Sequence, residues 1–270
     1  MNFLDQLPLG IIFAAGVIGQ VVFIELGFRY GQSQQGKGRK AQLAQVRAIM
    51  GASLGLLAFM LAFTFSSAQQ HFEERTRAYM LEVSAIDSAY RGADLIGAEK
   101  RVQAQDLLRH FAKLRVRIAN AVRADDPETV VDMIRESERI HDVLWAIAES
   151  SMEGANGGED TGIFAQSVLA MVNAHDARLQ AALFNRISPV IWLTLFAMAL
   201  LSMLVTGYQA GLTGTRSRLA TWTLAITFAG VMTLITDLDR PNMTLFSVDQ
   251  QLMVELENRM ESKDTWKSEN

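Results

Sequence analysis

The sequence predicts an all-α integral membrane protein with four transmembrane helices and a helical bundle inserted between spans 2 and 3. Half of the residues are hydrophobic, yet they gather in four long apolar windows separated by highly charged stretches. The longest charged stretch carries apolar residues at helical spacing and few strand signals. We therefore expect four parts: 1–68 with transmembrane helices 1 and 2, 69–186 as a helical extramembrane domain, 187–236 with transmembrane helices 3 and 4, and 237–270 as a C-terminal tail.

Each apolar window can cross a bilayer core of roughly 30 Å, which takes about 20 apolar residues in a helix. The windows cover approximately residues 7–28, 48–68, 187–208 and 219–235. No basic residue precedes the first window, and that window includes Gln20 and Glu25. We therefore interpret it as a span rather than a cleaved signal peptide.

The two short loops on one side of the predicted membrane region are basic. The loop after the first span and the loop between the third and fourth spans contain lysine and arginine but no acidic residue. Short basic loops remain in the cytoplasm. A multi-pass protein of the cell inner membrane is therefore expected, with residues 69–186 and both termini in the periplasm.

The second span is expected to continue as a long helix, from about residue 47 to beyond residue 91. Apolar residues recur at helical spacing after the span, and no helix breaker interrupts them. A further helix is expected to start at Asp126-Pro127, where an N-cap side chain precedes proline at the first helical position. Another is expected to restart the chain at Ser188-Pro189. After Pro241 we expect a short amphipathic helix, lying on the membrane surface or on the insert.

One face of the second span carries small residues, which let another helix approach closely. This face consists of Gly51, Gly55, Ala58 and Ala62. Plain helix packing explains such a face, since small stripes are widespread in transmembrane helices.

The same span could also line a pore. Phe59 and Phe63 lie one turn apart beside the small face, and an apolar ring made by several copies could gate by dewetting. The pore-lining or gate candidates are Phe59, Phe63, Phe65, Ser53 and Ser67. Lipid contact is the alternative for the phenylalanines.

Ionisable residues near the span ends are the ion-pathway candidates: Glu25, Asp237 and Asp239. A structural anchor is an equally good explanation for them. If the two aspartates face a pore mouth, neutralising both should shift ion selectivity. If they pack against Arg240 or a neighbouring basic residue, neutralising both should instead lower stability or break the oligomer.

Catalytic machinery is not expected. The sequence has no HExxH, GxSxG or phosphate-binding loop and no cysteine, so we expect neither an enzyme nor a cofactor. The histidines have no partner at metal-ligand spacing, so no metal site is expected. His141-Asp142 and His175-Asp176 are expected on solvated helix faces. A net charge of −4 gives no support for nucleic-acid binding.

Several stretches together resemble a bacterial four-transmembrane family of unknown function, the bestrophin-like family. They are the run 51–66, the run 82–91 from Glu82 to Arg91, Ile191-Trp192, the run 207–211, the run 234–241 with Asp-Leu-Asp-Arg-Pro, and 246–248. The family often has a glycine soon after that proline, whereas Asn242-Met-Thr follows here. The resemblance covers nearly the whole chain.

The resemblance implies a function by analogy. Bestrophins are oligomeric anion channels whose second span lines the pore with phenylalanines, and Phe59, Phe63 and Phe65 are similar in position. Bestrophins keep their large helical part in the cytosol, whereas the charge bias here places the insert outside.

The leading hypothesis is a homo-oligomeric ion channel in the lipid bilayer, with small ions and copies of itself as partners. The first alternative is a non-conducting membrane-anchored sensor whose external bundle binds a partner or ligand. The second is a subunit of a proton-driven motor or transport complex, whose insert would be cytoplasmic.

Overall fold

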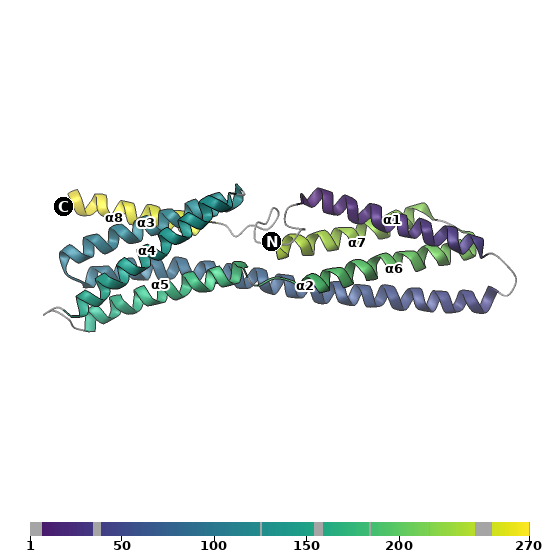
Figure 1. Ribbon diagram of the computed structural model, residues 1–270, viewed down its shortest axis with the longest axis horizontal. Coiled ribbons are helices and arrows are strands. Elements are labelled where there is room, and N and C mark those ends of the chain that lie inside the picture. The colour runs from purple at the N-terminus through teal and green to yellow at the C-terminus, as the bar shows by residue number, and fades with distance from the viewer. Residues whose placement is uncertain are drawn as a thin grey trace. The chain divides into compact units, whose positions relative to one another are not determined.

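The computed structural model describes residues 7–34, 39–124, 126–153, 159–183, 185–215, 217–240 and 250–269. Within these residues the chain is helical and has no strand. The helices are α1 (Leu9–Ser33), α2 (Arg39–Gly92), a short 3-10 turn (Ala93–Leu95), α3 (Ala98–Arg123), α4 (Pro127–Met152), α5 (Glu159–Leu183), α6 (Pro189–Thr213), α7 (Arg218–Asp239) and α8 (Gln251–Glu269) (Figure 1). The predicted all-α class is confirmed.

The chain forms two compact units. Unit 1 comprises residues 1–72 and 186–246, and unit 2 comprises residues 73–185 and 247–270. The long helix α2 contributes residues to both units, so the expected continuation of the second span as one helix is confirmed.

Unit 1 contains the membrane-spanning helices. The apolar part of α2, together with α1, α6 and α7, is long and apolar enough to cross a membrane, in agreement with the four predicted spans. Ser188 caps α6 by accepting from the Val190 N–H at 3.4 Å, and proline follows at the first helical position, as the sequence predicts. Gly214, at φ 68°, ends α6 in the left-handed conformation that favours glycine.

Helices α1 and α6 cross with their backbones in contact, through a pair of glycines on each helix. A methyl group on Gly27 would fall on the Leu204 carbonyl, and one on Gly207 would fall on the Ile24 carbonyl. One turn further along, a methyl group on Gly31 would lie 3.1 Å from the Gly211 Cα. Only glycine permits this approach, so these residues fix the α1–α6 crossing.

Unit 2 is a helical bundle with its own apolar core. It is formed by the second part of α2 with α3, α4, α5 and α8. Asp126 caps α4 by accepting from the Thr129 N–H at 3.2 Å, with Pro127 at the first helical position, as the sequence predicts. The largest fully buried side chains of this core are Tyr90, Phe111, Phe164, Ile86, Leu108, Leu114, Leu144 and Met171.

The tail helix α8 belongs to the bundle of unit 2. Met253, Leu256 and Met260 are buried in its core. The Met253 N–H donates to the Tyr79 hydroxyl at 3.0 Å, and the Tyr90 hydroxyl donates to the Met260 carbonyl at 3.3 Å. Of the two locations considered for this helix, the structure therefore shows contact with the insert.

Candidate functional site

The small-residue face of the second span has no partner helix within the described part of the chain. Gly51, Gly55, Ala58 and Ala62 are all exposed. A methyl group added at Gly51 or Gly55 would meet no atom within 4 Å. This face is therefore open for contact with lipid, with another copy of the chain, or with a pore.

The two phenylalanines beside this face are also open, with 66% of Phe59 and 63% of Phe63 exposed. The other gate candidates lie differently. Phe65 is partly buried against the apolar cluster shared with α6 and α7, and Ser53 and Ser67 are partly buried. The structure therefore groups Phe59 and Phe63 with the open face, and Phe65 with the packed face.

The opposite face of the second span packs within the chain. Leu57, Leu61 and Ala68 are buried in a cluster with residues of α6 and α7, and Thr64 is buried on the same side. The Thr64 hydroxyl donates to the Met60 carbonyl at 2.7 Å, which satisfies it inside its own helix. The span thus has one packed face and one open face.

The acidic candidates are already engaged by groups of their own chain. Glu25 pairs with Arg29 at 2.9 Å on α1. Asp237 and Asp239 are buried, and an Asp239 carboxylate oxygen accepts from the Ile187 N–H at 2.8 Å. The Asp239 carboxylate therefore holds the backbone just before α6 starts. An ion-pathway role for these residues remains a prediction.

Sequence reasoning missed a buried ionic cluster in unit 2, centred on Glu82 of α2. One oxygen of Glu82 lies 3.0 Å from the Arg115 Nε of α3 and 3.1 Å from the His175 Nδ1 of α5. Its other oxygen pairs with Arg178. Glu82 is fully buried, and the side chains of Arg115 and His175 are 3% and 2% exposed. The cluster ties three helices of the bundle together.

A second layer of rings completes this cluster. His141 of α4 lies against Phe111 and His175, with ring centroids 4.9 and 4.8 Å away. The Arg178 guanidinium lies over the Tyr79 ring, 4.9 Å from its centroid. We expected His141 and His175 on solvated faces, and this expectation is wrong because both side chains point into the core.

Burial and neighbouring charges shift the protonation of this cluster. Burial opposes ionisation of Glu82, but Arg115, His175 and Arg178 outweigh it and lower its pKa to about 2. Burial lowers the pKa of His141 to about 4, and His175 adds to the effect. Burial also lowers the pKa of Arg115 to about 10, against the attraction of Glu82. At neutral pH, Glu82 and Arg115 are therefore charged and His141 is neutral.

A family model described as a bestrophin-like domain matches residues 18–251. The chain belongs to the bestrophin-like family. No curated protein and no solved structure matches it. The family match includes the open face of the second span and the whole ionic cluster around Glu82.

The sequence of this bestrophin-like chain did contain a signal for the cluster. Glu82 follows Tyr79 by three residues and precedes Ile86 by four, which places a carboxylate on the buried stripe of α2. Arg115 follows Phe111 by four residues on the buried stripe of α3. Charged residues inside apolar stripes mark a paired cluster, because an isolated buried charge is too unfavourable.

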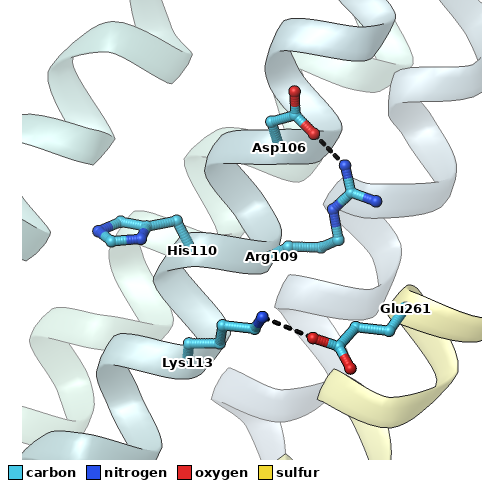
Figure 2. Close-up of a pocket in the computed structure, with 5 residues that line it drawn as sticks. All are labelled: Asp106, Arg109, His110, Lys113 and Glu261. Atoms are coloured by element: carbon cyan, nitrogen blue, oxygen red, sulfur yellow. Dashed lines mark hydrogen bonds and ion pairs between the residues drawn. The ribbon is translucent and has the colours of Figure 1, made fainter. Parts of the chain in front are cut away.

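The bestrophin-like chain also has a surface pocket of about 330 Å³ between α3 and α8. In Figure 2, Arg109 reaches Asp106 along α3, and Lys113 reaches across to Glu261 of α8. His110, which also lines the pocket, pairs with Glu136 at 2.7 Å. These pairs satisfy the charges of the pocket and help to hold α8. Among the described residues, no group of acidic or histidine side chains has the arrangement of a metal site.

Proposed function

We propose that this bestrophin-like protein is a homo-oligomeric ion channel whose pore is lined by the second span. The observation that carries the proposal is the division of α2 into two faces. Leu57 and Leu61 pack against the chain's own helices, whereas Gly55, Phe59 and Phe63 are left open. Copies arranged around an axis would place this open face toward the axis.

The open face suits a narrow apolar constriction. Gly51, Gly55, Ala58 and Ala62 allow neighbouring copies of the helix to approach closely. Phe59 and Phe63 would then form two rings one helical turn apart, about 5–6 Å along the axis. Such apolar rings gate by dewetting, so their size sets the conductance.

The proposal places the protein in a bacterial inner membrane with the bundle of unit 2 in the periplasm. The support is the charge of two short loops, one between the first two spans and one between the last two, in which every charged residue is basic. The proposed activity is ion movement, and it requires no catalytic step.

Planar-bilayer recording of the purified protein tests conduction. Wild-type protein should give discrete currents, and Phe63→Ala should change their size or ion selectivity because it removes one apolar ring. The matched control is Leu193→Ala on α6, an apolar side chain that is 71% exposed on a different span. Its currents should equal those of the wild type. Equal currents from Phe63→Ala and wild type would refute pore lining by this residue.

Substitution of Gly55 tests assembly separately from conduction. Gly55→Leu should leave the subunit folded, since nothing in the described chain lies within 4 Å of the added Cβ. The bulky side chain of Gly55→Leu should nevertheless prevent close approach of neighbouring copies and break the oligomer. Mass photometry of the protein in nanodiscs measures the number of copies. An unchanged oligomer would place the open face against lipid.

The rival function is a non-conducting sensor whose bundle binds a partner or ligand. The surface pocket between α3 and α8 is the feature that favours it. If planar-bilayer recording of a folded, oligomeric wild-type preparation gives no current, the result would support the sensor function and reject the channel.

A further inference from the structure

The ionic cluster of unit 2 carries an excess of positive charge. Glu82 is the carboxylate that pairs with both Arg115 and Arg178, and His141 is neutral at neutral pH. One negative charge thus faces two positive charges. The charge of Asp176 acts to raise the pKa of His141, but the Asp176 side chain lies on the exposed side of α5.

Several nitrogens of the cluster lack a hydrogen-bond partner. The Arg115 Nε lies close to Glu82 without the direction of a hydrogen bond, and the Arg115 Nη1 also has no hydrogen-bond partner. The His141 Nε2 likewise has none, although His141 is only 7% exposed. A buried donor without an acceptor destabilises a fold by about 1–3 kcal/mol, and more when it is charged.

These donors belong to neighbouring side chains on two helices. Arg115 lies one turn after Phe111 on α3, and the Phe111 ring contacts His141 of α4 at 4.9 Å. His175 borders the same region; its Nδ1 faces Glu82, and its Nε2 is a further buried nitrogen without a hydrogen-bond partner. The unpaired nitrogens have almost no solvent-exposed area, so a partner for them would be small and enclosed by the bundle.

We propose that the bundle of unit 2 binds one small monatomic anion, a halide, between Arg115 and His141. A halide accepts several N–H groups at once and neutralises the excess charge of the cluster. A water molecule would accept the same hydrogen bonds but would leave the charge in place.

The proposed site lies between α3, which carries Arg115, and α4, which carries His141. Arg115 also contacts Glu82 of α2, and Glu82 contacts His175 of α5. Halide binding should therefore stabilise the folded bundle, because a ligand that binds only the native state raises its stability by mass action. This effect is independent of conduction, so it holds whether or not the second span lines a pore.

The test is equilibrium binding of radioactive chloride to the full-length protein, with thermal unfolding measured in parallel. Sodium bromide replaces sodium gluconate stepwise at constant ionic strength and neutral pH. We expect one chloride site per chain in the bundle and a melting temperature that rises with bromide and then saturates.

His141→Phe keeps the ring packing against Phe111 but removes the nitrogen donor, so binding should weaken about tenfold. Arg115→Lys keeps the charge but removes the guanidinium donors and should weaken binding by a similar factor. His110→Phe is the matched control, because His110 lies on the surface of α3 and pairs with Glu136. It should bind as the wild type does.

Equal stabilisation by bromide and gluconate in the wild-type protein would overturn the proposal, and this comparison needs no variant to fold. Chloride binding that is unchanged in a folded His141→Phe protein would also overturn it, since the ion would then occupy another place such as the pore. Phe63→Ala should leave the bundle site intact, which separates this result from the channel proposal.

Discussion

The contact between α1 and α6 predicts a large difference between two glycine substitutions on the same helix. Gly27→Ala would place a methyl group on the Leu204 carbonyl and 2.9 Å from the Tyr208 backbone nitrogen. Ordinary contact of a Cβ begins at 3.4 Å, whereas the carbonyl oxygen would lie at 2.0 Å, so the oxygen would have to move by more than 1 Å. Backbone atoms can move this far only if the whole helix moves. Overpacking of this kind destabilises a protein by about 1–3 kcal/mol.

Gly19→Ala supplies the control, because its added methyl group would lie 3.7 Å from a flexible Leu200 methyl. Both substitutions gain the same helix propensity, up to about 1 kcal/mol in favour of alanine. We therefore expect Gly19→Ala to be neutral or stabilising and Gly27→Ala to be destabilising. Gly207→Ala should also be destabilising, and the double variant with Gly27→Ala should lose less than the sum, because either methyl group already separates the helices.

Unfolding in mixed detergent micelles containing dodecyl sulfate, followed by circular dichroism, measures these differences. The unfolding midpoints should rank Gly19→Ala at or above wild type and Gly27→Ala clearly below it. Equal midpoints for Gly27→Ala and Gly19→Ala would refute the close crossing of α1 and α6.

Three further predictions concern other parts of the chain. The pKa of His141 is about 4 in the folded state against 6.5 for the free side chain. As the pH falls, the unfolded chain therefore takes up this proton at a higher pH than the folded chain does. The bundle should therefore lose up to about 3 kcal/mol as pH falls from 6.5 to 4, and His141→Phe should abolish this part of the pH dependence, measured by denaturant unfolding. In this cysteine-free chain, Ser150→Cys should react with an impermeant maleimide in intact cells while Thr215→Cys stays unlabelled; the reverse pattern would place the bundle in the cytoplasm. Asp239→Ala should lower thermal stability without altering ion selectivity, because alanine has no oxygen to accept from the Ile187 N–H; altered selectivity at unchanged stability would instead support a role of Asp239 in the ion pathway.

The helices were predictable from sequence because their signals are local. Apolar length predicts the spans, and Asp126-Pro127 and Ser188-Pro189 predict the starts of α4 and α6, since caps depend on neighbours in the chain. The same signals predict that α2 continues beyond its span. These features need no knowledge of which helices touch.

The pairing of helices was not predictable in the same way. Gly27 and Gly207 are 180 residues apart in the sequence, and nothing in the residues around either glycine identifies the other as its contact. Glu82 meets His175 and Arg115 only because α2, α3 and α5 turn these positions toward one core. Long-range contacts of this kind depend on helix order and rotation, which periodicity alone leaves open.

The two faces of α2 carry different kinds of information about function. In unit 2, Glu82 on the buried side of α2 pairs with arginines of other helices. The rotation of α2 about its own axis in the bundle is therefore fixed by charge as well as by packing. In unit 1 the open side has small residues and two exposed phenylalanines, and nothing in the described chain covers them. A helix held from one side and open on the other is suited to meet copies of itself. The oligomer measured with Gly55→Leu therefore decides whether this open face is a contact between copies of the chain, and bilayer recording of Phe63→Ala decides whether it lines a pore.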